Sequence, residues 1–290
     1  MKDFVKLIEC PRDAMQGIKG FIPTEKKINY INALLNIGFD TLDMGSFVSP
    51  HTVPQMADTS LVLANIKWEL SKSKLLAIVA NFRGAQEAAT FEQISYIGFP
   101  FSVSETFQKR NTNSTIEESF INVDRIQNLC VRTNKEMVLY ISMGFGNPYG
   151  DVWNADIVMQ WVEKIKAMGI NIISLSDTVG IANPDSIAYL FKEVIKEFDN
   201  IEFGAHLHTT PETWKEKVEA AFNNGCKRFD GAFKGYGGCP MASDALVGNM
   251  PMENLISFFN EKQVKHNLQE QYIPDALMLA DDVFSYSVFH

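Results

Sequence analysis

The chain has few cysteines and no long apolar run. None of its four cysteines forms a CxxC pair or a compact disulfide framework, which favours a reducing compartment over secretion; they are Cys10, Cys130, Cys226 and Cys239. No stretch of about 18 consecutive apolar residues could span a membrane. The amino terminus shows no signal or transit peptide, because residues 5–8 already have the pattern of a strand. We therefore expect a cytoplasmic protein without a membrane partner.

Positive charge is also scarce. The 290 residues contain 26 lysines and arginines against 35 acidic residues, and the formal net charge is -9. This balance argues against the extended basic surface of a nucleic-acid-binding protein, so no nucleic-acid partner is expected. An anionic substrate would need a local group of basic residues. The GxGxxG turn of dinucleotide-binding sheets is missing after the first predicted strand.

A predicted strand followed by a predicted helix recurs eight times along the chain. The strands are expected at residues 5–9, 41–44, 75–79, 94–97, 137–141, 170–175, 201–205 and 227–230. The helices are expected at residues 24–37, 60–70, 83–90, 116–133, 155–168, 185–197, 213–223 and 252–259, with polar segments at 11–17 and 102–115. This pattern is typical of a (β/α)₈ TIM barrel of about 250 residues, although a doubly wound sheet shares the alternation. We expect one α/β catalytic domain over residues 1–290, with the barrel at about 4–260 and a helical extension at about 261–290.

Two histidines follow the seventh predicted strand. Side chains two residues apart on a strand point to the same face, so His206 and His208 are expected to converge. Two neutral imidazoles suit a divalent first-row metal ion. A hydrogen-bonded histidine pair on a half-exposed strand is the alternative.

Other polar side chains fall at the ends of predicted strands, where barrel enzymes assemble their sites; they are Arg12, Asp13, Asp43 and Asp177. Each also has an ordinary interpretation, as a surface ion pair, a solvated strand end or a turn residue. A doubly wound sheet uses the same edge, so it stays the rival fold. The coincidence of all these residues at strand ends favours a metal site.

Several segments resemble the 3-hydroxy-3-methylglutaryl-CoA lyase family, within the metal-dependent lyases and Claisen-type condensing enzymes on TIM barrels. They are residues 11–16 (PRDAMQ), 46–50 (SFVSP) with 53–56 (VPQM), 114–120 (STIEESF), 173–180 (ISLSDTVG) and 235–240 (GYGGCP). The similarity extends over about residues 5–259. Its most specific part is the GxGGCP segment followed by Gly248 and Asn249.

The resemblance implies a lyase that cleaves 3-hydroxy-3-methylglutaryl-CoA, or a close 3-hydroxyacyl-CoA, into acetyl-CoA and acetoacetate by a metal-assisted retro-Claisen mechanism. It implies Mg²⁺ or Mn²⁺ as cofactor, bound by Asp13, His206, His208 and Asn249. Arg12 would hold the thioester oxygen, where negative charge grows in the transition state. Cys239 or His206 would transfer the proton, and Asp43 and Asp177 complete the expected catalytic set.

The acyl-CoA substrate is the expected small-molecule partner, and a homodimer stays open. Basic side chains are expected to hold the CoA phosphates; the candidates are Lys19, which matches a lysine position of the family, and Lys109, Arg110 and Lys234. Their alternative is solvated loop charge. Cys239 and Asn249 also have alternatives, as a buried small hydrophobic side chain and a turn residue.

The sequence departs from the family pattern at several positions. Ala14 and Met15 stand where the family has Gly-Leu, Asp43 replaces a glutamate, and Thr209 follows His208 where an aspartate is usual. Neighbouring carboxylates orient the metal ligands, and the size of the pocket selects the acyl group. The resemblance therefore predicts the metal ligands more firmly than the identity of the substrate. Two alternatives follow: a condensing or aldolase member acting on a 2-oxo acid, and a non-catalytic metal- or CoA-binding paralogue.

Overall fold

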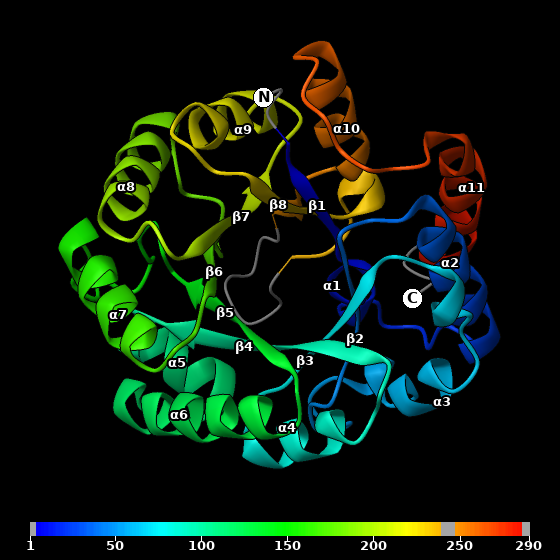
Figure 1. Ribbon diagram of the computed structural model, residues 1–290, viewed down its shortest axis with the longest axis horizontal. Helices are drawn as coiled ribbons and strands as arrows, with labels where there is room; N and C mark the ends of the chain where they lie inside the picture. Colours follow the sequence, from blue (N-terminus) through cyan, green and yellow to red (C-terminus); the bar gives the residue numbers. More distant parts are fainter. Residues whose placement is uncertain (1–3, 239–246, 286–290) are drawn as a thin grey trace.

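A closed ring of parallel strands forms the centre of the protein (Figure 1). The computed structural model describes residues 4–238 and 247–285. Each strand pairs with the next, and β8 pairs with β1 to close the ring. The strands are β1 (Lys6–Glu9), β2 (Thr41–Ser46), β3 (Lys74–Ile78), β4 (Ile94–Ser102), β5 (Glu136–Ser142), β6 (Ile172–Asp177), β7 (Glu202–Thr209) and β8 (Arg228–Gly231). The predicted (β/α)₈ TIM barrel is confirmed, and the doubly wound alternative is wrong.

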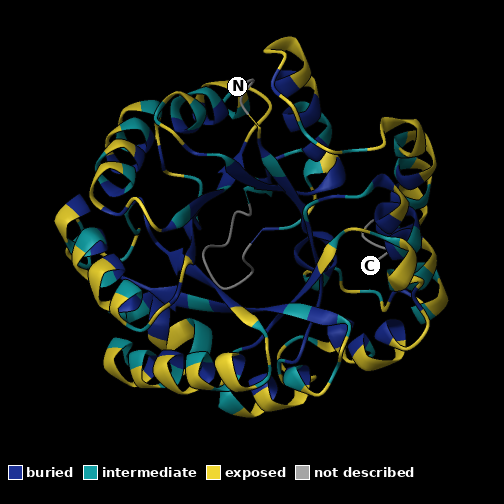
Figure 2. Ribbon diagram, viewed as in Figure 1, coloured by how far each residue is buried: buried dark blue, intermediate teal, exposed yellow. Residues whose placement is uncertain are grey.

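Helices surround the barrel, and Figure 2 shows that their inner faces are buried while their outer faces are exposed. They are α2 (Thr24–Ile37), α3 (Thr59–Leu63), α4 (Phe82–Ala89), α6 (Ile116–Arg132), α7 (Ala155–Ala167), α8 (Pro184–Glu197), α9 (Trp214–Asn223) and α10 (Met252–Glu261). Their ends follow local chemistry. Thr115 and Glu118 form a capping box at the start of α6, and Gly38 adopts a left-handed conformation that ends α2.

Two segments predicted as polar loops contain helices. Residues 11–17 include α1 (Pro11–Gln16), which proline can begin because the first helical position needs no amide hydrogen. Residues 102–115 include α5 (Glu105–Thr112), which Ser104 caps by accepting a hydrogen bond from the amide of Phe107. Both predictions were wrong because strand-to-helix connections can hold a short helix that lacks an apolar periodicity.

Three further boundaries differ from the predictions. The helix expected at 60–70 is interrupted, and only α3 and the 3₁₀ turn η2 (Trp68–Leu70) form there. Asn32 accepts a hydrogen bond from the amide of Lys67 at 2.8 Å, which replaces a helical bond. Strand β7 continues to Thr209, so both histidines lie inside it. The short strand β9 (Gly248–Asn249), which was not predicted, pairs antiparallel with β7.

The main apolar core lies between the barrel and its helices. A smaller apolar cluster comes from strands β3 to β6 and consists of Leu76, Ile78, Tyr96, Val138, Tyr140 and Ile172. Alternate residues of a barrel strand face its interior, so these side chains fill the inside of the barrel. Polar side chains that face the interior therefore gather at the carboxyl-terminal end of the barrel.

The carboxyl-terminal helix α11 (Ile273–Phe284) packs outside the barrel against α2. The 3₁₀ turn η4 (Glu270–Tyr272) precedes it, and the rings of Tyr30 and Phe284 meet edge to face at 5.9 Å. The predicted carboxyl-terminal helix is therefore present, while the proposed domain limits stay a prediction. In the described ranges, no helix combines the length and the apolar character that a membrane crossing needs.

Candidate active site

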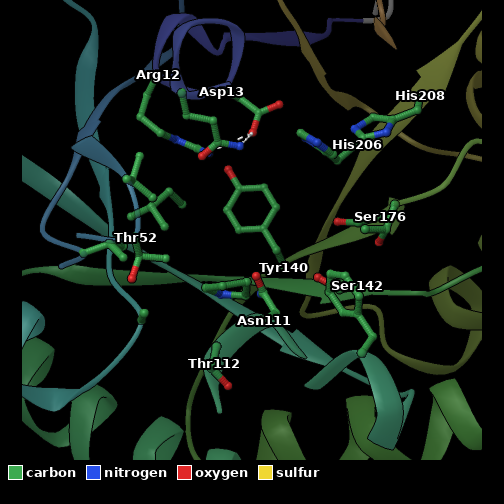
Figure 3. Close-up of a pocket in the computed structure, with 18 residues that line it drawn as sticks. Arg12, Asp13, Thr52, Asn111, Thr112, Tyr140, Ser142, Ser176, His206 and His208 are labelled. Carbon is green, nitrogen blue, oxygen red and sulfur yellow. Dashed lines mark hydrogen bonds and ion pairs between the residues drawn. The ribbon is translucent and has the colours of Figure 1, made fainter. Parts of the chain in front are cut away.

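The carboxyl-terminal end of the barrel opens into a cavity of about 170 Å³. Arg12, Asp13, His206 and His208 line one part of it, and Figure 3 shows Tyr140 pointing toward them. Pockets that enclose drug-sized ligands are typically about 300–1,000 Å³. The cavity therefore has room for an acyl group, and a bulkier carrier attached to it must extend outside.

Two buried side chains, Asp13 and His208, and the half-buried His206 converge on one point of this cavity. The donor atoms of Asp13, His206 and His208 lie within 4.8 Å of one another. The two histidines are alternate residues of β7, and Asp13 lies in α1 directly after β1. The predicted convergence of the histidines is confirmed, and the structure adds the carboxylate that the spacing alone could not place.

The electrostatic state of this group suits a divalent cation. Burial lowers the pKa of His208 to about 4, with help from the neighbouring His206, so its imidazole is neutral at pH 7. Burial alone would raise the pKa of Asp13, but Arg12 and the histidines lower it to about 2. A charged carboxylate next to a neutral imidazole forms the donor set that such an ion needs.

Asn249 reaches the same group from β9. Its strand position is in register with His208, and its Nδ2 donates hydrogen bonds to Asp13 Oδ2 at 2.7 Å and to the carbonyl of Tyr236 at 2.9 Å. The amide group must therefore rotate before its oxygen can bind a cation. The structure thus brings all four expected metal ligands together.

Arg12 is held rigidly beside these residues. Its Nε and Nη2 donate to the carboxylate of Asp43, while Nη1 donates to Asp13 at 2.8 Å and to Gln16 at 2.9 Å. Burial alone would lower the pKa of Arg12, but Asp43 and Asp13 hold it above its ordinary value. Gln16 is one helical turn after Arg12, so the unpredicted helix α1 is what brings these two side chains together. The guanidinium is charged and fixed at the cavity wall.

Asp177 does not line the cavity. Its carboxylate accepts hydrogen bonds from Lys217 Nζ at 2.7 Å and from the amide of Ala182 at 3.0 Å. The same Nζ donates to the carbonyl of His208 at 2.9 Å. The structure therefore places Asp177 behind the site, where it and Lys217 support the histidine strand, and its catalytic role stays a prediction.

Replacing Lys217 with methionine should destabilise the protein by about 3–5 kcal/mol, because it leaves the carboxylate of Asp177 buried without its partner. Urea unfolding would measure the loss. The control is Lys215→Met, which breaks an exposed pair with Glu261 and should change stability by less than about 1 kcal/mol. Equal effects of the two substitutions would contradict the buried-support role.

The predicted CoA-binding residues lie on the surface. Lys109 and Arg110 belong to α5, whose next residues Asn111 and Thr112 line the cavity. Lys109 pairs with Glu105 at 3.1 Å, and the Arg110 guanidinium lies 4.5 Å from the ring centre of Tyr149. Lys19 is exposed shortly after α1. The CoA role of these residues stays a prediction.

Lys234 belongs to the 3₁₀ turn η3 (Phe233–Gly235) and is exposed. Its Nζ pairs with Asp281 of α11 at 2.5 Å, and its amide donates to Glu253 at 3.0 Å. The charge of Lys234 is therefore already paired within the protein. The predicted Cys239 lies outside the described residues.

A family model described as HMGL-like matches residues 5–279 of the chain. The chain belongs to the HMGL-like family. The cytoplasmic 3-hydroxy-3-methylglutaryl-CoA lyase of Rattus norvegicus is 33% identical over 263 residues, which cover 90% of the chain and 75% of that relative. The mitochondrial hydroxymethylglutaryl-CoA lyase of Gallus gallus is 32% identical over 93% of the chain and 90% of its own length.

A solved structure of an HMG-CoA lyase from Acinetobacter baumannii, in complex with coenzyme A and 3-methylmalate, superimposes with a TM-score of 0.90. It is 27% identical and covers 98% of the chain and 92% of its own chain. Membership of the HMGL-like family confirms the resemblance inferred from the PRDAMQ and GYGGCP segments.

Sequence reasoning missed two groups of residues in this HMGL-like site. Tyr140 Oη and Ser176 Oγ are buried at the cavity without a hydrogen-bond partner among the described residues. Asp230 of β8 accepts a hydrogen bond from His206 Nδ1 at 3.1 Å. All three lie near the ends of strands. A tyrosine and a serine there carry no charge, and Asp230 is the last residue of a predicted strand, so the sequence alone gives no sign of a role in the site.

Proposed function

We propose that the chain is a carbon-carbon lyase that cleaves 3-hydroxy-3-methylglutaryl-CoA, or a close 3-hydroxyacyl-CoA, into acetyl-CoA and acetoacetate. The observation that carries this proposal is the convergence of Asp13, His206 and His208 beside the fixed guanidinium of Arg12. Relatives that are named for this reaction, and whose matches cover most of the chain, support it.

The donor set favours Mg²⁺ or Mn²⁺ as the cofactor. Asp13, His206 and His208 would hold the ion, with Asn249 after rotation of its amide. Mixed oxygen and nitrogen donors without a thiolate suit these ions better than a closed zinc site. When bound, such an ion supplies Lewis-acid polarisation of the substrate oxygens.

Arg12 stabilises the charge that develops when the carbon-carbon bond breaks. The bonding electrons move onto the acetyl-CoA fragment, whose thioester oxygen becomes an enolate oxygen beside the guanidinium. Asp43, Asp13 and Gln16 hold that guanidinium in place before substrate arrives, so little reorganisation is needed.

His206 is placed to hold or move a proton. Burial alone would lower the pKa of His206, but the hydrogen bond and the charge of Asp230 raise it above its ordinary value. The substrate hydroxyl must lose a proton and the enolate carbon must gain one. A nearby base takes the first proton, and we assign the second transfer to the thiol of Cys239 or, where Nε2 of the imidazole does not hold the ion, to His206.

The CoA part of the substrate must lie outside the cavity, which has room only for the acyl part. Lys19, Lys109 and Arg110 are the proposed phosphate partners, and Lys234 is a weaker one because Asp281 already pairs with it. The coenzyme A complex of the related Acinetobacter baumannii enzyme supports an acyl-CoA ligand. The relatives include cytoplasmic and mitochondrial enzymes, so the cytoplasmic location stays a prediction, as does the homodimer.

Purified protein incubated with Mg²⁺ or Mn²⁺ and 3-hydroxy-3-methylglutaryl-CoA should release acetyl-CoA and acetoacetate in equal amounts. A chelator should stop the release, and added metal should restore it. Faster consumption of acetyl-CoA with 2-oxo acids would favour a condensing enzyme. Thermal stabilisation by metal or acyl-CoA without turnover would favour a non-catalytic paralogue, because binding alone stabilises the folded state.

A further inference from the structure

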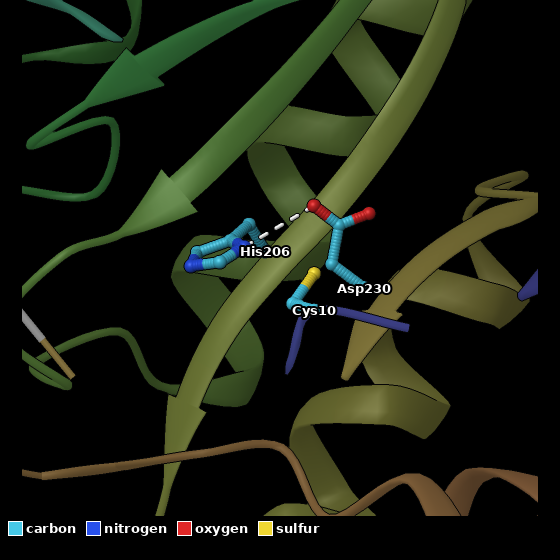
Figure 4. A group of neighbouring side chains, drawn as sticks. All are labelled: Cys10, His206 and Asp230. Carbon is cyan, nitrogen blue, oxygen red and sulfur yellow. Dashed lines mark hydrogen bonds and ion pairs between the residues drawn. The ribbon is translucent and has the colours of Figure 1, made fainter. Parts of the chain in front are cut away.

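A second group of metal-binding side chains lies on the Nδ1 side of His206. The donor atoms of Cys10, His206 and Asp230 come within 4.8 Å of one another (Figure 4). The barrel register explains the arrangement, because Asp230 of β8 is opposite His206 of β7 on one side and Ile8 of β1 on the other. Cys10 follows Ile8 by two residues, so both residues are expected to face the barrel interior.

Two members of this group have unused binding capacity. Asp230 Oδ2 lies 3.1 Å from His206 Nδ1, but Oδ1 has no hydrogen-bond partner among the described residues, and Asp230 is only 2% exposed. A buried polar atom left unpaired destabilises the folded state, so a ligand that pairs with it is favoured. The Cys10 sulfur makes one long contact of 3.8 Å with the carbonyl of Ile8. The lyase mechanism gives the Cys10 thiol no task.

We propose that Cys10, His206 and Asp230 form a second cation site for a thiophilic divalent ion such as Zn²⁺ or Cd²⁺, and that its occupation excludes the cation of the active site. Thiolate, imidazole and carboxylate together favour these ions over Mg²⁺ and Mn²⁺. The carboxylates of Asp13 and Asp43 lie near the thiol, and their negative charge also favours a dication.

The shared imidazole makes the two sites exclusive. A neutral His206 carries one ring proton, which Nδ1 can share with Asp230 in the empty site. An ion bound to Nδ1 moves that proton to Nε2, which then has no lone pair for the active-site cation. The thiol proton of Cys10 is released to solvent as the sulfur binds the ion. The ion reaches the site through the cavity, where the His206 side chain is 14% exposed.

Titration of the Mn²⁺-loaded full chain with Cd²⁺ tests this site. The ultraviolet charge-transfer band of a cadmium thiolate should appear at one Cd²⁺ per chain, and electron paramagnetic resonance should show an equal release of Mn²⁺. A band without Mn²⁺ release would overturn the exclusion. Release without a band would place Cd²⁺ in the active site and overturn the second site.

Substitution of single cysteines shows which sulfur binds Cd²⁺. The band should be lost in Cys10→Ala and Cys10→Ser, of which the serine variant preserves size, while circular dichroism confirms that both are folded. It should remain in Cys226→Ala, the matched control, because Cys226 is equally buried and lies outside the cluster. It should also remain in Cys239→Ser. A band that persists without Cys10 or disappears without Cys239 would overturn the proposal.

Discussion

Alanine at Asp13 or at His208 is expected to remove cation binding and cleavage together. Both side chains are buried and direct their donor atoms to one point, so each contributes binding free energy to the ion directly. Loss of a residue that only supports a metal ligand costs about 10–100-fold in affinity or activity. Loss of a ligand should therefore lower both the affinity for the cation and the cleavage activity by at least about 100-fold. Electron paramagnetic resonance of bound Mn²⁺ and the rate of acetyl-CoA release measure the two effects.

The matched control for this experiment is Thr209→Val. Thr209 adjoins His208 in β7 and is buried, but its side chain points to the other face of the strand. Its hydroxyl has no hydrogen-bond partner among the described residues, so valine should keep the fold and the bound Mn²⁺. A His208→Ala protein with stoichiometric Mn²⁺ would show that the imidazole is not a ligand.

Lysine at position 12 is expected to lower the turnover number by about 10²–10³-fold, the typical effect of removing one donor from a developing oxyanion. The substitution preserves the positive charge but not the planar fork that donates to Asp43, Asp13 and Gln16. The substrate-saturated rate should therefore fall while Mn²⁺ remains bound. Stopped-time product assays and Mn²⁺ resonance on the same preparation separate the two quantities.

Asp43→Asn provides the comparison for Arg12→Lys. It keeps the size of the side chain and removes the charge that anchors the guanidinium, so its loss of turnover should be smaller than that of Arg12→Lys. An Arg12→Lys enzyme with unchanged turnover would refute the role in charge stabilisation. Loss of Mn²⁺ from that variant would instead assign Arg12 to the support of Asp13.

The barrel and the histidine pair could be predicted because their signals are local. Alternating apolar strands and amphipathic helices repeat along the chain, and His206 and His208 share a strand face by spacing alone. Arg12, Asp13 and Asp43 are predicted from their positions at strand ends, whereas Asn249 and Cys239 are predicted only by the resemblance to a family. Tyr140 shows the limit, because a tyrosine within an apolar strand gives no sign that its hydroxyl ends at a cavity without a partner.

Contacts between distant segments could not be predicted from the sequence. Asp177 lies at the end of a predicted strand. Its carboxylate nevertheless pairs with Lys217, 40 residues later, and not with a group of the cavity. The pairing of β9 with β7 likewise joins Asn249 to His208 across 41 residues. No local propensity encodes such pairs, because they exist only after the barrel has formed.

The pairing of β1 with β8 brings residues from the first strand and from the last strands of the barrel together in the active site. Asp13 follows the first strand, whereas His206 and His208 come from the seventh and Asn249 from beyond the eighth. Loop-closure entropy opposes contacts between such distant segments until late in folding. The metal-binding side chains can therefore converge only after the barrel has closed. A truncated chain that ends before β8 would leave Asp13 without this geometry, however well its earlier strands had folded.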